Sequence, residues 1–261
     1  MTPVTLLLHS TGTMPSMWTP YHAIVAPLGV PVAPSHLGYP PYAPIARGQI
    51  VTAHDDARAV IDALPASATD VHIVAHSYGG LVALEIVRQL GPRVRSLFLF
   101  EPTLFATVLA APDATPDARA ALVAMTENPA VLHSVATGGD DNWIEFFIDF
   151  WNRPGSWQRM PEPQRQLVRA LGWKLYQEVR SVFTIDVAAG LTIGRDVPVT
   201  LACGERTQPV ARAVVDLMAR RIPHAEVTVV NGTGHMAPLT HPALTTTVVQ
   251  AHVARVRLAS D

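Results

Sequence analysis

The sequence contains little charge and almost no cysteine. Of its 261 residues only 15% are Asp, Glu, Lys or Arg, and the formal net charge is −2 without any block of like charges. This balance argues against nucleic acid or an anionic membrane as a partner. The single cysteine, Cys203, excludes an internal disulfide framework and fits a reducing compartment.

Long apolar runs and targeting patterns are also missing. No apolar stretch approaches the ~20 residues that span a bilayer. The first residues, from Met1 to Val4, lead directly into an apolar strand pattern, without a basic segment or a cleavage site of a signal peptide. We therefore expect a soluble, cytoplasmic protein with no membrane span. An apolar fraction of 49% is enough for a sizeable core, in one large domain or two small ones.

Strand and helix patterns alternate through most of the chain. Short β-branched and apolar runs predict buried strands, and apolar residues at helical spacing between them predict helices. Thr52 and Asp55 are placed as the cap and first-turn acid of one of these helices. Such alternation is typical of a parallel α/β sheet. The expected strands are residues 4–8, 30–34, 71–75, 94–100, 197–203 and 225–230, and the expected helices are residues 21–28, 52–64, 81–90, 209–221 and 242–258.

The stretch from Pro102 to Asp196 breaks this alternation. It shows helical patterns near residues 116–126, 142–151, 163–178 and 179–189, without a strong strand pattern. Four of the five tryptophans lie in it, together with several phenylalanines. We expect this segment to form a helical lid over the carboxyl edge of the sheet. The alternative is a helical subdomain whose aromatic side chains fill only its own core.

The residues from Val71 to Gly80 carry the clearest chemical motif. A buried strand is predicted to end in a tight turn at Ser77, and a helical pattern begins directly behind it. Such a turn leaves room only for small neighbours, and Ala75, Gly79 and Gly80 are small. The pattern is that of the G-x-S-x-G nucleophile elbow with alanine at its first position. The N-terminus of the following helix would stabilise negative charge that forms beside the serine.

A serine nucleophile needs an imidazole as its base, and His235 is the best placed of the eleven histidines. It lies in a glycine-rich loop after the last predicted strand, where it can reach the carboxyl edge of the sheet. His76 lies on the other side of the turn, and we expect it to pack or hydrogen bond beneath that turn. His9 ends the first predicted strand, and we expect it to hold the following loop in place.

Three motifs in this order resemble those of the α/β-hydrolase superfamily, over nearly the whole chain. They are similar to the family's HG-x-G loop, elbow and late histidine, and read His9-Ser10-Thr11-Gly12, Ala75-His76-Ser77-Tyr78-Gly79-Gly80 and Gly232-Thr233-Gly234-His235. The resemblance implies an α/β-hydrolase fold, with a mostly parallel sheet of about six strands and helices on both faces. It implies a core of residues 1–101 and 197–261 and a helical cap of residues 102–196. Because the chain starts at the family's third strand, the usual first two strands are expected to be missing.

The resemblance also implies roles for individual residues. Ser77 would be the nucleophile and His235 the general base. The backbone N–H groups of Tyr78 and Thr11 would form the oxyanion hole. We expect no metal ion and no cofactor. The side chains expected to line the substrate pocket are those of Trp143, Phe147 and Trp151.

The sequence departs from the family pattern at the triad acid. This acid usually follows the penultimate strand in a G-x-x-D pattern, but Thr207 stands at that position here. Glu101, directly after the strand 94–100, and Glu205 are the candidate replacements, and a dyad without an acid is a third arrangement. We favour Glu101, because some members of the superfamily carry their acid after this strand. Ser10 also replaces the usual glycine of the HG pair, which is expected to reshape that loop.

We therefore expect a serine hydrolase that cleaves a small to medium hydrophobic carboxylic ester, thioester or lactone through an acyl-Ser77 intermediate. Haloalkane dehalogenases and epoxide hydrolases of this superfamily attack with aspartate, so the serine separates the chain from them. The alternatives are a carbon–carbon bond hydrolase with the same triad and a catalytically silent member that binds a small ligand. The expected partner is a small hydrophobic substrate, and the sequence is compatible with a homodimer.

Overall fold

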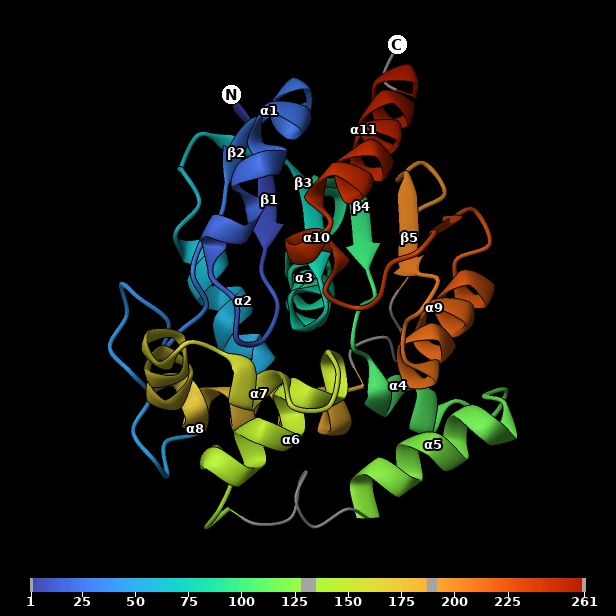
Figure 1. Ribbon diagram of the computed structural model, residues 1–261. Coiled ribbons are helices and arrows are strands. Elements are labelled where there is room, and N and C mark those ends of the chain that lie inside the picture. The colour runs from blue at the N-terminus through green and yellow to red at the C-terminus, as the bar shows by residue number, and fades with distance from the viewer. Residues whose placement is uncertain (1, 128–134, 187–191, 260–261) are drawn as a thin grey trace.

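A single parallel sheet forms the centre of the molecule (Figure 1). The computed structural model describes residues 2–127, 135–186 and 192–259. Within these residues six strands pair side by side in the order β2-β1-β3-β4-β5-β6, each parallel to its neighbours. The strands are β1 (Thr2–Leu8), β2 (Val30–Val32), β3 (Ala68–His76), β4 (Val94–Phe100), β5 (Val199–Gly204) and β6 (Glu226–Val230). The predicted parallel sheet is confirmed.

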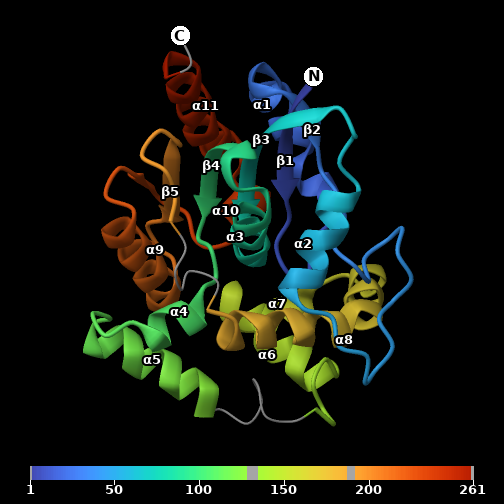
Figure 2. The same ribbon diagram turned by 180° about the vertical axis from the view of Figure 1, so that it is seen from behind.

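Helices cover both faces of this sheet, as Figures 1 and 2 show from opposite sides. One face is covered by α1 (His22–Val25) and α11 (Pro242–Leu258). The other face is covered by α2 (Ala53–Asp62), α3 (Tyr78–Leu90) and α9 (Pro209–Arg221). The predicted cap of α2 is confirmed, since Thr52 and Asp55 form a reciprocal capping box.

Side chains of each central strand point alternately to the two faces. In β1, Leu7 packs in a cluster with Trp18 and Val249, whereas Leu6 and Leu8 pack in the larger cluster beneath α2 and α3. Each of these three leucines is fully buried. A strand covered on both faces is apolar at every position, which is why continuous apolar runs, rather than alternating ones, predict this sheet.

The segment between β4 and β5 leaves the sheet and folds into helices at the carboxyl ends of the strands. In Figure 1 the arrows of β1 and β4 point toward these helices, and both chain termini lie at the opposite end of the molecule. This helical insertion therefore covers the edge of the sheet where Ser77 lies. Its helices are α4 (Phe105–Ala110), α5 (Pro116–Glu127), α6 (Asp141–Trp151), α7 (Ser156–Arg159) and α8 (Glu162–Thr184).

The insertion differs from the prediction in its last helix. The sequence predicts two helices, residues 163–178 and 179–189, but α8 runs without interruption from Glu162 to Thr184. The reason is that no glycine or proline follows Glu178 within the helix, so nothing breaks the hydrogen-bond ladder there. Residues 187–189 of the predicted second helix lie outside the described residues.

Several short elements are also absent from the prediction or differ from it. The expected helix 21–28 is divided between α1 and two 3₁₀ turns, and the expected strand 30–34 ends at Val32. Elements of one or two turns are too short to show a periodic pattern. They are the 3₁₀ turns Pro15–Tyr21, Ala26–Leu28 and Gly91–Arg93, with α4, α7 and α10 (Ala237–Thr240). None of the described helices combines the length and the apolar character needed to cross a membrane.

Candidate active site

Ser77 occupies a strained turn between β3 and α3. Its backbone has φ 55° and ψ −121°, a region that side-chain-bearing residues rarely adopt. The turn is held because the Ser77 N–H donates to the Phe100 carbonyl at 3.0 Å and the Gly80 N–H donates to the Ser77 carbonyl at 2.8 Å. The strained conformation and the predicted elbow therefore coincide at this serine.

The two glycines behind Ser77 are required by close packing. A Cβ atom on Gly79 would lie 2.4 Å from the Leu8 carbonyl oxygen, and a Cβ atom on Gly80 would lie 2.5 Å from the Pro102 side chain. Both distances are shorter than any real carbon contact. The small residues of the motif thus let α3 begin directly against β1 and against the segment that follows β4.

His235 lies between Ser77 and Glu101. Its Nε2 atom is 2.9 Å from Ser77 Oγ, and its Nδ1 atom is 2.6 Å from Glu101 Oε2. An ionised carboxylate only accepts hydrogen bonds, so the proton of the neutral imidazole belongs on Nδ1. Nε2 is then free to accept the hydroxyl hydrogen of Ser77. The structure thus brings the three predicted side chains into one hydrogen-bonded series. This series is buried: His235 is 4% exposed and Ser77 is 5% exposed.

The Glu101 carboxylate is fully buried and held by several donors. Its Oε1 accepts the Gly204 N–H at 2.7 Å, and its Oε2 accepts the Thr207 hydroxyl at 2.5 Å as well as the bond from His235. The Glu101 backbone also has a positive φ, 43°. Thr207, which stands where the family usually has its acid, therefore donates to the carboxylate that reaches His235 from the neighbouring strand.

Glu205 lies elsewhere. Its side chain is exposed, and its Oε2 accepts the backbone N–H of Gly232 at 2.8 Å. This bond connects the end of β5 to the loop that carries His235. Of the two carboxylates considered from the sequence, the structure brings Glu101 to the imidazole, and Glu205 supports the loop.

Two further histidines support the backbone around the site. His76 Nε2 donates to the His235 carbonyl at 2.8 Å, and burial lowers the pKa of His76 well below its usual value. His9 Nδ1 lies 3.0 Å from the Ser10 carbonyl, and its Nε2 accepts the His36 N–H at 3.3 Å. Burial also lowers the pKa of His9, so both rings are neutral at physiological pH. The expected supporting positions of His76 and His9 are confirmed.

The loop after β1 forms a tight turn beside Ser77. The Thr13 N–H donates to the Ser10 carbonyl at 3.2 Å, the Ser10 and Thr13 hydroxyls lie 3.0 Å apart, and Gly12 has φ 73°. The serine that replaces the usual glycine thus closes the turn with its side chain. Thr11, at the tip of the turn, lines the same cavity as Ser77, and Tyr78 begins α3.

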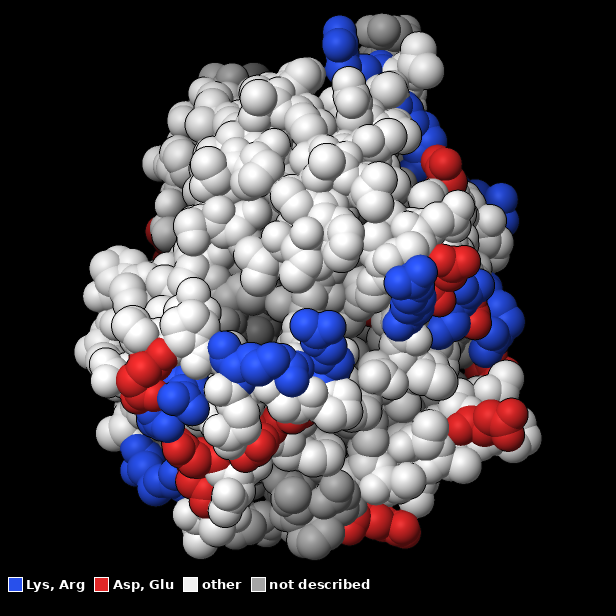
Figure 3. All heavy atoms as spheres, in the orientation of Figure 1, with Lys and Arg blue, Asp and Glu red and all other residues white. Residues whose placement is uncertain are grey.

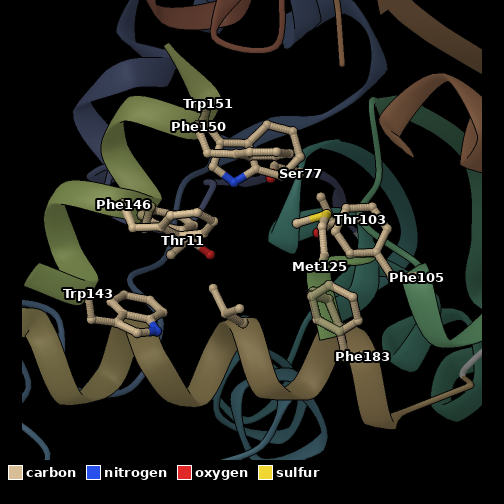
Figure 4. A pocket seen from close by; sticks show the side chains of 13 residues that line it. Thr11, Ser77, Thr103, Phe105, Met125, Trp143, Phe146, Phe150, Trp151 and Phe183 are labelled. Atoms are coloured by element: carbon tan, nitrogen blue, oxygen red, sulfur yellow. The ribbon is translucent and has the colours of Figure 1, made fainter. Parts of the chain in front are cut away.

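An aromatic cavity opens in front of Ser77 (Figure 4). Its walls come from α5, α6, α8 and the start of α4, and the only hydroxyl-bearing side chains among its described lining residues are Thr11, Ser77 and Thr103. The three aromatic residues predicted for the pocket all line it. The lining residues are Thr11, Ser77, Thr103, Phe105, Met125, Trp143, Phe146, Phe147, Phe150, Trp151, Val179, Val182 and Phe183.

A second pocket also includes Ser77, and we call it the loop pocket. It shares Thr11, Ser77, Phe147 and Trp151 with the aromatic cavity, but it also includes His235. Its remaining lining residues are Ser10, Gly12, Thr13, Ile148, Asn152, Met160, Val168, Met236 and Leu239. Figure 3 shows a hollow at the border between the sheet core and the insertion, with Lys and Arg side chains gathered beside it.

Trp151 has a second contact that the sequence does not predict. Its ring stacks on the His235 imidazole, with 3.9 Å between centroids and 29° between planes. Trp143 stacks in turn on Phe147, with 5.4 Å between centroids. The spacing of Phe147 and Trp151, one helical turn apart in α6, places both on the cavity face, but only the folded chain shows that one covers the imidazole.

These features together define an α/β hydrolase: a parallel sheet, a serine on a strained turn, and a late histidine at the same edge. The chain belongs to the Alpha/beta hydrolase family, which it matches over residues 5–247. A search of curated protein sequences finds no significant match.

Solved structures share this fold at low sequence identity. An esterase from Thermogutta terrifontis superposes with a TM-score of 0.60 at 18% identity, over 97% of this chain and 90% of that chain. A loop variant of a haloalkane dehalogenase from Bradyrhizobium elkanii superposes with a TM-score of 0.64 at 21% identity, over 99% of this chain and 91% of that chain. A structure from a study of carboxylesterases of Nitrososphaera gargenis superposes with a TM-score of 0.63 at 15% identity, over 98% of this chain and 91% of that chain. At such identities the likeness shows the fold, and chemistry has to be argued from this chain's own residues.

Proposed function

We propose that this protein is a serine hydrolase that cleaves carboxylic esters, or related thioesters or lactones, through an acyl-Ser77 intermediate. The observation that carries the proposal is the hydrogen-bonded chain from Ser77 Oγ through His235 to Glu101, with separations of 2.9 and 2.6 Å. A nucleophile, a base and an orienting carboxylate in this order are what acyl transfer requires. A member that only binds a ligand would not need this arrangement.

In the proposed reaction, Ser77 Oγ attacks the ester carbonyl carbon while its proton passes to His235 Nε2. Glu101 keeps the imidazole in the required tautomer and stabilises the imidazolium. The carbon–oxygen bond then breaks, and the leaving oxygen takes the proton from Nε2. A water molecule attacks the acyl group, gives one proton to Nε2, and releases the carboxylic acid as Ser77 recovers its proton.

The negative oxygen of both tetrahedral intermediates needs hydrogen-bond donors. We assign this role to the backbone N–H groups of Tyr78 and Thr11. The Tyr78 N–H belongs to the first turn of α3, where the helix dipole also favours negative charge. Each such donor is worth about 3 kcal/mol of the barrier.

Two pockets meeting at Ser77 suggest how the substrate is oriented. His235, which must protonate the leaving oxygen, lines the loop pocket and is not among the residues of the aromatic cavity. The leaving group therefore belongs in the loop pocket and the acyl group in the aromatic cavity. Because no charged side chain among the described residues lines that cavity, the acyl group is uncharged and hydrophobic. We accordingly assign residues 102–196 as the cap that recognises the acyl group.

The test is hydrolysis of p-nitrophenyl esters by the wild type and by Ser77→Ala. We expect kcat to fall by about 10⁴-fold or more in the variant, whereas Ser67→Ala, at an exposed serine, remains at the wild-type rate. A fluorophosphonate probe should label the wild type and leave Ser77→Ala unlabelled. Equal turnover by Ser77→Ala would refute the mechanism, and a wild type that is neither labelled nor active would favour the ligand-binding alternative.

A further inference from the structure

A cluster of three charged side chains is buried between the core and the insertion, and the triad does not use it. Asp56 on α2 and Lys174 and Glu178 on α8 are each at most 1% exposed. Lys174 Nζ lies 2.5 Å from Asp56 Oδ2 and 3.6 Å from Glu178 Oε1. Burying charges costs several kcal/mol per ion, and the pairing often fails to recover it. Stability alone therefore gives a weak reason for charges at this place.

The cluster is bonded to the residue that follows the nucleophile. The Tyr78 hydroxyl donates to Asp56 Oδ2 at 2.6 Å. The second oxygen of Asp56 accepts the Leu37 N–H at 2.9 Å. The side chain of Tyr78 is thus fixed at its far end, while its backbone N–H is one of the two proposed oxyanion donors.

The same cluster is bonded to the loop that carries the other proposed donor. The Tyr39 hydroxyl donates to Glu178 Oε2 at 3.0 Å and accepts the Gly12 N–H at 2.9 Å. A Cβ atom on Gly12 would lie 3.9 Å from the Leu175 side chain, so α8 packs directly on this loop. One relay, from Glu178 through Tyr39 to Gly12, therefore ends one residue away from Thr11.

We infer that Asp56, Lys174 and Glu178 are positioning residues, which hold the backbone N–H groups of Thr11 and Tyr78 where the oxyanion forms. The inference rests on the proposed serine hydrolase function. Lys174 lies between the two carboxylates and keeps each of them directed toward its tyrosine. The insertion then contributes to catalysis as well as to recognition, because α8 supplies two of the three charges.

The charge of this cluster changes near neutral pH. Burial raises the pKa of Glu178 to about 7, against the opposing effect of the Lys174 ammonium. The tyrosines and histidines that face it from the neighbouring elements have pKa values outside this range. Burial raises the pKa values of Tyr39 and Tyr78 well above 10, lowers that of His9, and lowers that of His36 to about 3. Asp56 and Lys174 form an ion pair.

The ionisation of Glu178 should change kcat with pH, which a purely structural role of the cluster would not do. Below pH 7 the protonated Glu178 leaves the cluster neutral. Above pH 7 its carboxylate adds a negative charge beside the loop, which opposes a developing oxyanion. The wild-type kcat should therefore contain a component that falls as the pH rises through about 7.

The experiment compares Glu178→Gln and Glu178→Leu with the control Glu162→Gln. Glu162 lies in the same helix, 47% exposed, and pairs with Arg165 and Arg169 on the surface. In Glu178→Gln the falling component of the kcat profile should disappear, and at pH 6 its kcat should match the wild type. Glu178→Leu cannot accept from Tyr39, so we expect about a tenfold loss of kcat with KM nearly unchanged. The rate of fluorophosphonate labelling should fall in parallel.

Two results would overturn the inference while the proposed function stands. One is a Glu178→Gln profile that coincides with the wild type from pH 5 to 9. The other is a folded Glu178→Leu variant with wild-type kcat and labelling rate. If Glu178→Leu does not fold, the pH profile of kcat for Glu178→Gln alone decides whether the cluster positions the donors. A wild type that neither hydrolyses esters nor reacts with the probe would instead mean that the proposed function has failed.

Discussion

The sheet core and the helical insertion contribute to the site in different ways. The core holds Ser77, Glu101 and His235 through its backbone: Ser77 and Glu101 both have positive φ, and the His235 carbonyl accepts a hydrogen bond from His76. The insertion contributes side chains from regular helices, namely the aromatic walls of the cavity and the Lys174 and Glu178 charges. Ser77, Glu101 and His235 each follow a strand of the parallel sheet, directly or after a short loop, so the sheet edge fixes where they lie. The comparison places the Ser77–His235–Glu101 chain in the core, and the aromatic walls and two of the three buried charges in the insertion.

After Ser77→Ala, the largest effect should come from a change of the Glu101 carboxylate in the core. In Glu101→Gln the side chain keeps its shape, but its amide can donate to His235 Nδ1, which moves the imidazole proton to Nε2. That tautomer cannot accept the Ser77 hydroxyl proton, so we expect kcat to fall by about 10³- to 10⁴-fold. Steady-state hydrolysis of a p-nitrophenyl ester measures the loss.

The control for this substitution is Glu205→Gln. Glutamine at position 205 can still accept the Gly232 N–H, so we expect kcat within about threefold of the wild type, as for other surface changes. A large loss of kcat in Glu205→Gln together with a small loss in Glu101→Gln would mean that Glu205, and not Glu101, orients the imidazole.

A smaller effect should come from the Thr207 hydroxyl, which donates to the Glu101 carboxylate. Thr207→Val removes the donor to Glu101 Oε2 and keeps the side-chain shape. A hydrogen bond to a charged group is worth about 1.5–3 kcal/mol, so we expect at least about a tenfold loss of kcat. Thr207→Ser keeps the hydroxyl and should remain close to the wild type. If valine and serine behave alike, the hydroxyl has no part in holding the carboxylate.

The core could be predicted from the sequence because its signals are local. Strands buried on both faces are continuous apolar runs, and the turn at Ser77 needs small residues at fixed neighbouring positions. The late histidine could be placed because a loop after a parallel strand ends at the same edge of the sheet. The choice of Glu101 over Glu205 came from the resemblance to superfamily members that carry their acid after this strand, and in the structure β4 lies beside β3 and pairs with it up to Phe100.

Features that depend on distant contacts could not be predicted in this way. Lys174 and Asp56 are 118 residues apart in the sequence, and neither lies in a recognisable motif. The stacking of Trp151 on His235 depends on how the insertion sits on the core. The sequence divided α8 into two helices at Glu178, whereas the helix continues to Thr184 with Val179, Val182 and Phe183 buried.

The smallest expected effect tests whether the insertion recognises the acyl group. Phe183 lines the aromatic cavity from α8, and Phe183→Leu enlarges the cavity while keeping it apolar. We expect kcat/KM for a p-nitrophenyl octanoate, relative to the acetate, to rise by roughly three- to tenfold, within the range that a change of a few carbon atoms in a pocket produces. The matched control, Leu167→Ala, changes a residue of the same helix that is 43% exposed and does not line the cavity. If the octanoate-to-acetate ratio of kcat/KM is the same in both variants, the acyl chain lies outside the cavity. The aromatic side chains of the insertion would then have no part in recognising the acyl group.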